Sequence, residues 1–169
     1  YQFDWAATLL ELMGGKVPAS WDAHSFLYAL RDGREAGRDS LVLSNCAWAC
    51  QRSARWDRYL LIRSYHTGFK NYPELMLFDV EADPHEAEDL AAARPDLVAQ
   101  GLARIDEWQT DELRRSHTAT DPLWAVMREG GPFHASFRSP AFAKYLERLR
   151  HTGRAEFAAE LERRAARLR

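Results

Sequence analysis

The stretch of sequence that decides the fold covers residues 75–91 and reads LMLFDVEADPHEAEDLA. Its first five residues form a short, mainly apolar run, which predicts a β-strand over 75–79. The Asp83-Pro84 pair that follows predicts a tight turn. Pro84 at a first helical position and Glu86 in a first turn then predict the start of a helix. The stretch therefore predicts a strand, a turn and a helix in succession.

Other short apolar runs predict further strands upstream. Residues 41–43 and 59–63 are rich in Leu, Val, Ile and Tyr, and residues 47–55 can continue or pair with the first of these runs. Trp56-Asp57-Arg58 predicts a tight turn, and residues 66–74 predict a longer loop. Together with 75–79, these runs predict a small antiparallel sheet of three to four strands.

A long amphipathic helix is predicted to begin at Pro95 and Asp96. Its apolar residues recur at steps of three and four: Val98, Leu102, Ile105 and Trp108. Such a helix would cover one face of the sheet, so the predicted fold class is α+β.

The two ends of the chain predict helices. Asp4 can cap a helix that ends at Gly14-Gly15, with Ala6, Leu9, Leu10 and Met13 on its apolar face, and a short helix follows over 25–30. Residues 121–124 and 129–134 carry loop signals. Two further helices, separated by Gly153, predict a helical C-terminal extension. The predicted organisation is 1–33, 34–117 and 118–169.

Composition excludes several classes of partner. The chain has 169 residues, 46% of them hydrophobic and 28% charged, with a net charge of −2. Such a balance is typical of a globular protein and gives no overall basic field for nucleic acid or an anionic membrane. Apolar runs are too short for a membrane span. We therefore expect no nucleic-acid partner and no membrane partner.

Two cysteines, Cys46 and Cys50, bear on the compartment. On one strand they would lie roughly 13 Å apart, too far for a disulfide unless a turn came between them. Two buried, reduced thiols are the expectation. Together with an opening at Tyr1 that shows no signal-peptide pattern, they favour the cytoplasm. The abrupt opening also suggests a processed or excised piece.

Four segments resemble, in order, motifs from the C-terminal part of sulfatases. Residues 4–12 (DWAATLLEL) resemble the D-x-x-P-T-L-L-x-L-A-G helix, and residues 21–26 (WDAHSF) resemble the D-G-x-S-L turn. Residues 52–62 (RSARWDRYLLI) are similar to the x-R-x-x-x-y-K-y-I hairpin. Residues 83–91 (DPHEAEDLA) resemble D-P-x-E-x-x-N-L-A. The chain departs from these motifs at Ala7, Met13, Ala23, Leu60 and Asp89.

This resemblance implies the C-terminal portion of an alkaline-phosphatase-like α/β fold. Residues 1–33 would end the catalytic domain, and residues 34–117 would form the α+β subdomain. The family hydrolyses sulfate esters with a formylglycine, made from a Cys or Ser in a C/S-x-P-x-R motif, beside a divalent metal, for which calcium is expected. Residues 50–55 of this chain lack the proline and arginine of that motif, with Arg52 and Ala54 in their places. Cys50 is therefore rejected as the nucleophile.

Three residues are candidates for substrate binding: His66, Lys70 and His134. An imidazole and an ammonium four residues apart could contact an anionic sulfate ester or sugar hydroxyls, and His134 could lean over an active-site mouth from a Gly-Pro loop. The plainer alternative is a loop histidine, a solvated lysine and an ordinary turn. His85 and Glu86 are too few for a metal site, so no catalytic residue and no metal ligand are assigned to this chain.

The predicted function is that of a structural, pocket-shaping part of a sulfatase-type hydrolase, inactive alone. Its expected partners are the missing N-terminal catalytic domain and a sulfate-ester substrate. Alternatives are a related phosphodiesterase or phosphonate hydrolase, and a stand-alone module that binds an anionic carbohydrate through the 66–72 loop and tryptophans. A homo-oligomer formed through the C-terminal helices is a further alternative, with Phe157, Leu161 and Leu168 as contacts.

Overall fold

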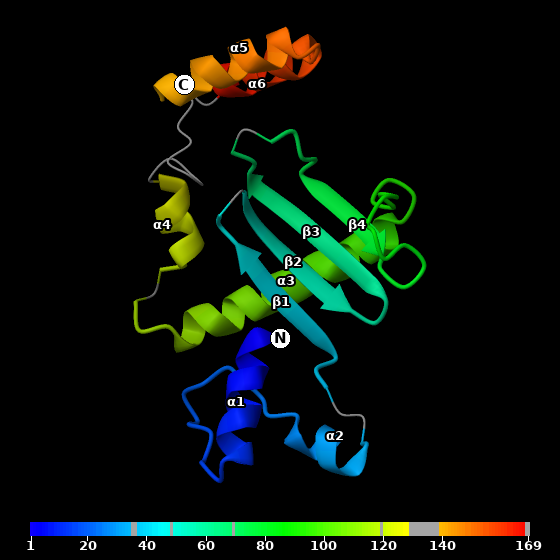
Figure 1. The fold of residues 1–169 in the computed structure, drawn as a ribbon, viewed down its shortest axis with the longest axis vertical. Helices are drawn as coiled ribbons and strands as arrows, with labels where there is room; N and C mark the ends of the chain where they lie inside the picture. Colours follow the sequence, from blue (N-terminus) through cyan, green and yellow to red (C-terminus); the bar gives the residue numbers. More distant parts are fainter. Residues whose placement is uncertain (35–36, 48, 69, 119, 129–138, 168–169) are drawn as a thin grey trace. The chain divides into compact units, whose positions relative to one another are not determined.

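The computed structural model describes residues 1–34, 37–47, 49–68, 70–118, 120–128 and 139–167. These residues form two compact units, 1–39 and 40–169, and Figure 1 shows their helices and strands. The three-part division expected from the sequence stays a prediction.

The first unit contains α1 (Gln2–Leu12) and α2 (Leu27–Asp32). The N-cap of α1 is Tyr1, so the predicted cap at Asp4 is wrong. The Asp4 carboxylate instead accepts hydrogen bonds from the His24 backbone N–H and the Arg38 guanidinium, both at 2.7 Å. These contacts join α1 to the segments before and after α2.

The predicted apolar face of α1 is not the buried one. Ala7 and Thr8 are buried, whereas Leu9 is exposed and Met13 is 77% exposed. The Thr8 hydroxyl accounts for its burial, because it donates to the Asp4 carbonyl (2.6 Å) and accepts from the Phe26 N–H (3.0 Å). Local hydrogen bonding therefore turns α1 away from the orientation that periodicity alone predicts.

The second unit is built on a four-stranded antiparallel sheet in the order β1-β2-β3-β4. Its strands are β1 (Ser40–Asn45), β2 (Cys50–Trp56), β3 (Tyr59–His66) and β4 (Leu75–Asp79). A turn at 57–58 joins β2 to β3, as predicted, with Asp57 in the left-handed region at φ +46°. The predicted antiparallel sheet is confirmed, and β3 extends three residues further than expected.

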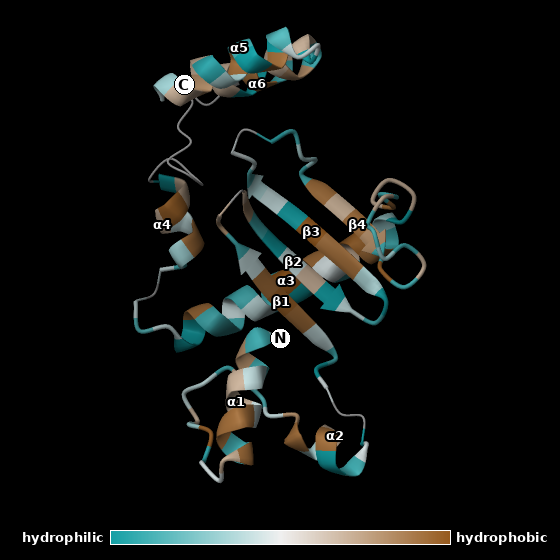
Figure 2. Cartoon of the chain, viewed as in Figure 1, coloured by the Kyte–Doolittle hydropathy of each residue, from teal (hydrophilic) through white to brown (hydrophobic). Residues whose placement is uncertain are grey.

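Helix α3 (Pro95–Arg115) covers one face of this sheet, as Figure 1 shows. Val98 and Ile105 of α3 pack against Ala54 of β2, Leu61 of β3 and Leu77 of β4. Figure 2 shows apolar residues along β1, β3 and β4. The predicted α+β fold class is confirmed, with the core between helix and sheet.

The helix predicted after the Asp83-Pro84 pair does not form. Residues 84–94 are turns and bends, and Glu86 has a φ of +53°. The Asp83 carboxylate accepts from the Glu88 N–H at 2.8 Å, and the Asp89 carboxylate accepts from the Leu77 N–H at 3.0 Å. Such side-chain bonds satisfy backbone groups without a helix, so the first helix after β4 is α3.

Within the residues that the structure describes, three helices follow α3: α4 (Pro122–Arg128), α5 (Pro140–His151) and α6 (Ala155–Arg167). The loop predicted at 121–124 is wrong, because the Asp121 carboxylate accepts from the Leu123 N–H at 3.0 Å and α4 begins there. Helices α5 and α6 form the predicted helical extension and turn at Gly153, whose φ is +75°. They share a small core: Phe142, Leu146, Leu149, Ala158, Leu161 and Ala165.

Among the helices in the described ranges, none has both the length and the apolar character needed to cross a bilayer.

Candidate functional site

His66, the first candidate residue, ends β3 and is half-buried. Its Nδ1 accepts a hydrogen bond from the Gly68 N–H at 2.9 Å. Burial lowers the pKa of His66 below its ordinary value of 6.5. The imidazole is therefore neutral at neutral pH, with Nδ1 as the acceptor of the Gly68 hydrogen bond.

Lys70 lies in the loop that follows His66, and its side chain is exposed. Its backbone N–H donates to the Thr67 carbonyl at 2.9 Å, which closes a turn between the two candidates. Arg164 of α6 reaches the same loop, with hydrogen bonds to Thr67 Oγ1 (3.3 Å) and Asn71 Oδ1 (2.6 Å). The structure thus places Lys70 in the loop directly after His66, and this loop is bound by Arg164, which the sequence did not single out.

His134, the third candidate, lies outside the described residues. Its assignment to substrate binding stays a prediction, as do those of His66 and Lys70.

Sequence reasoning missed a buried ion pair between β2 and the start of α4. Arg52 and Asp121 approach to 2.6 Å, and their side chains are 4% and 5% exposed. Gln109 donates to Asp121 at 3.2 Å, and the Arg52 guanidinium stacks over the Trp108 ring at 5.1 Å. The available signal was the alternation in β2, which points Arg52 to the same face as buried Ala54.

A pocket of about 470 Å³ lies beside α4 and is lined by Thr120, Trp124, Met127 and Arg128. The Trp124 ring is 46% exposed and meets the Tyr65 ring edge-on, with 5.9 Å between centroids. This exposure shows that Trp124 is not a core residue of the unit. An exposed indole beside a guanidinium and a hydroxyl can hold a ligand that has both an apolar face and a negative charge.

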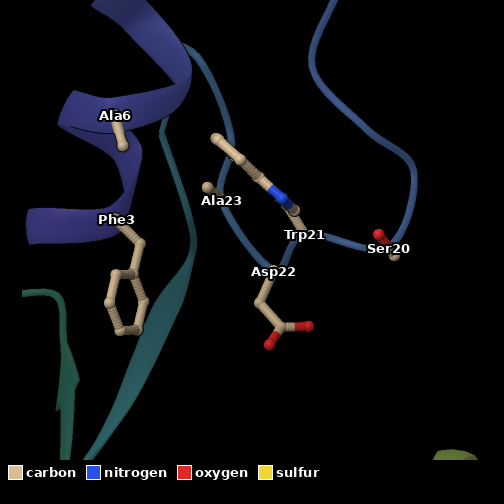
Figure 3. A pocket seen from close by; sticks show the side chains of 6 residues that line it. All are labelled: Phe3, Ala6, Ser20, Trp21, Asp22 and Ala23. Atoms are coloured by element: carbon tan, nitrogen blue, oxygen red, sulfur yellow. The ribbon is translucent and has the colours of Figure 1, made fainter.

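The first unit has its own pocket, of about 350 Å³, shown in Figure 3. Phe3 and Ala6 of α1 lie on one side, and Trp21 and Ala23 of the following loop lie on the other. Asp22 and Ser20 complete the lining. The walls are mainly apolar and aromatic, which suits an apolar side chain better than a charged ligand.

Both cysteines are free thiols. Cys50 is 0% exposed, and burial and the neighbouring Cys46 raise its pKa to about 11. A thiol that stays protonated at neutral pH is a poor nucleophile there. Cys46 is half-buried, not buried as expected, and a turn does come between the two cysteines.

Within the described ranges, no group of three or more His, Cys, Asp or Glu side chains could hold a metal ion. His85 and Glu86 are exposed in the turn after β4.

Comparison with known proteins gives the fold a context. No family model matches the chain. Among solved structures, yidJ of Bacteroides fragilis, assigned as a sulfatase, aligns with 62% of this chain at 22% identity and a TM-score of 0.51. A protein solved in complex with its substrate D-glucosamine-2-N,6-O-disulfate aligns with 63% of it at 19% identity and a TM-score of 0.53.

Over the aligned residues, the fold is sulfatase-like. This sulfatase-like fold corresponds to the α+β C-terminal subdomain that the sequence resemblance indicated. Each match covers 23% of the solved chain, so the present chain spans about a quarter of the length of those proteins.

Proposed function

We propose that this chain acts as the C-terminal portion of a larger sulfatase-type hydrolase, where it completes the fold and forms one wall of the substrate pocket. The observation that carries the proposal is the surface of the first unit. Eight of the thirteen exposed large hydrophobic side chains in the described residues fall within residues 1–39: Tyr1, Phe3, Trp5, Leu9, Leu12, Met13, Trp21 and Leu30.

Such a concentration of exposed apolar side chains in a small unit marks a contact surface. The register of the sheet indicates a second contact surface. Arg55 of β2 lies between Leu41 of β1 and Leu60 of β3, and Ser53 lies between Leu43 and Ile62 in the same way. Residues paired across a sheet point to the same face, so these four apolar side chains lie on the face opposite to α3. A catalytic domain packed on both surfaces would bury them.

The chemistry would then be divided between two parts. The catalytic domain would supply a formylglycine and a divalent metal, with calcium the expected ion, for attack on the sulfur of a sulfate ester. This chain would contribute binding groups from the 66–74 loop. In that arrangement the neutral His66 offers Nε2–H to a sulfate or sugar oxygen, and Lys70 adds a positive charge.

Activity of the isolated 169 residues gives the first test. Sulfate release from an aryl sulfate, with and without added calcium, is expected to stay at the level of the buffer control. Robust release by the isolated chain would overturn the proposal, because the chain would then hold a complete reactive centre.

A second test addresses the contact surface. In a longer protein that carries this chain, Leu9→Ser with Met13→Ser is expected to lower the thermal midpoint, since both side chains would be buried against the catalytic domain. Leu113→Ser, an exposed leucine on α3, is the matched control. Equal effects of the two changes would argue against the proposed contact.

The pocket beside α4 favours a second candidate function, binding of an anionic carbohydrate by this chain alone. The Trp124 ring can stack on a sugar face, and Arg128 can pair with a sulfate group. Titration with glucosamine 6-sulfate, followed by tryptophan fluorescence, is expected to saturate and to fail for Trp124→Ala. Trp5→Ala is the control, and unsulfated glucosamine is expected to bind more weakly. Equal binding of the two sugars would exclude this function.

A homo-oligomer formed through the C-terminal helices also stays a proposal, but the structure supports fewer of its expected contact residues. Leu161 is buried between α5 and α6, whereas Phe157 is exposed, and Leu168 lies outside the described residues. Sedimentation of wild type and Phe157→Ser tests it without opening the core of the hairpin. A monomeric wild type would exclude it.

A further inference from the structure

Cys46 and Cys50 flank the last residue pair of the β1–β2 ladder. Asn45 of β1 pairs with Gln51 of β2, Cys46 directly follows Asn45, and Cys50 directly precedes Gln51. Directly opposed Cα atoms in an antiparallel pair lie about 4.5–5.5 Å apart. A disulfide requires a Cα separation of about 4.4–6.8 Å. The two cysteines therefore adjoin a residue pair whose spacing is in the range that a disulfide needs.

The thiols also influence each other, because burial and the neighbouring Cys46 both raise the pKa of Cys50. The two residues differ in access, because Cys46 is half-buried and Cys50 is completely buried. A dissolved reagent therefore reaches Cys46 before Cys50.

We propose that Cys46 and Cys50 are a site of reversible disulfide formation by exchange with a low-molecular-weight disulfide such as oxidised glutathione. The Cys46 thiolate attacks one sulfur of the reagent, whose S–S bond breaks and releases one thiol. The Cys50 thiol then loses its proton to solvent and attacks the Cys46 sulfur, which releases the second thiol. Two cysteine thiols are oxidised, and one reagent disulfide is reduced to two thiols.

The cysteine pair lies next to the strand end that carries His66. Cys50 pairs across the sheet with His66, where the register of β2 and β3 shifts. Oxidation would tie the end of β2 covalently to the end of β1 and so restrain the strand end that carries His66. This proposal is independent of the proposed hydrolase function, because it rests on the sheet alone.

Alkylation and mass spectrometry test the proposal on the full 169-residue chain. After equilibration with excess oxidised glutathione, acid quenching and treatment with N-ethylmaleimide, trypsin gives a peptide of residues 39–52 that contains both cysteines. We expect this peptide to be lighter than the reduced one by two hydrogen atoms and to carry no alkyl group. Dithiothreitol should restore two alkylation sites.

Single variants separate an internal disulfide from other oxidation products. Cys50→Ser is expected to trap a glutathione adduct on Cys46. Cys46→Ser is expected to leave Cys50 unmodified. Because this second variant changes the more exposed cysteine, it provides a test even if Cys50→Ser does not fold. A wild-type peptide that stays reduced, or that carries glutathione on both cysteines, would overturn the proposal, as would disulfide-linked dimers on a non-reducing gel.

Discussion

Arg52 of β2 and Asp121 at the start of α4 form a buried ion pair, with 2.6 Å between Nη2 and a carboxylate oxygen. The two residues are 69 positions apart in the sequence. Their pairing fastens the segment after α3 to the sheet. Hydrogen bonds from Gln109 and the Leu123 N–H to Asp121 complete the arrangement.

Removal of one partner of this pair should be costly. Asp121→Ala leaves the Arg52 guanidinium buried without a counter-charge, so we expect the free energy of unfolding to fall by about 3–5 kcal/mol. Urea denaturation, followed by circular dichroism, measures the change. Asp111→Ala, in the exposed pair with Arg114, is the control and should change stability little.

Replacement of both partners should cost much less. A combined Arg52→Met and Asp121→Leu variant removes both buried charges at once and is expected to unfold near the wild-type midpoint. If the double variant is as unstable as Asp121→Ala, the loss arises from packing and not from an unpaired charge.

Gly101 on α3 is expected to tolerate no side chain. A Cβ atom there would lie 2.6 Å from Leu61 Cδ2 and 3.0 Å from Trp56 Cη2. Because such overpacking costs about 1–3 kcal/mol, it should outweigh the gain in helix propensity of about 1 kcal/mol. We therefore expect Gly101→Ala to lower the urea midpoint.

Gly37→Ala is the matched control, since a Cβ atom at Gly37 meets nothing within 4 Å. A stabilised Gly101→Ala variant would show that α3 can move away from the sheet.

His66 should make stability depend on pH. Its pKa is lower in the folded chain than its ordinary value of 6.5, because burial disfavours the imidazolium. The unfolded state therefore binds more protons, and stability rises with pH from the folded pKa up to about 6.5. Acidification through this window should destabilise the fold.

His66→Asn is expected to remove this contribution, while its side-chain oxygen can still accept from the Gly68 N–H. Urea midpoints measured at several pH values report the slope. His85→Asn, an exposed histidine, is the control and should keep the wild-type slope. An unchanged slope in His66→Asn would assign the dependence to other groups.

The Cys50 thiol should make disulfide closure faster at higher pH. Its pKa is raised to about 11, so the thiolate fraction grows about tenfold per pH unit well below that value. The adduct on Cys46 should accordingly resolve about tenfold faster for each unit between about pH 7 and pH 9. Quenched-flow alkylation measures this rate. A rate independent of pH would mean that loss of the Cys50 proton does not limit closure.

Local patterns predicted the second unit well. The apolar runs at 41–43, 59–63 and 75–79 became strands, and the periodic residues Val98 and Ile105 of α3 became its buried face. The local patterns gave wrong predictions where a side chain could hydrogen-bond the backbone groups of nearby residues. Asp83 and Asp89 hold residues 84–94 in turns, and Asp121 begins a helix in a segment expected to be a loop.

The assignment of His66 and Lys70 to substrate binding stays a prediction. His66 ends β3, and Lys70 lies in the loop that follows, close to it as their spacing of four residues suggested. The contact of Arg164 with that loop joins residues more than ninety positions apart, and no local pattern encodes it.

The sequence by itself determined the α+β class and the order of the strands and of α3, because hydrophobic periodicity and turn chemistry are local properties. Tertiary structure alone decided which groups are desolvated and which distant residues come into contact. It buried Arg52 against Asp121, lowered the pKa of His66, and brought Cys46 and Cys50 to the two sides of the last β1–β2 residue pair. Desolvation and long-range contact depend on the assembled chain, and so the chemistry of these groups does too.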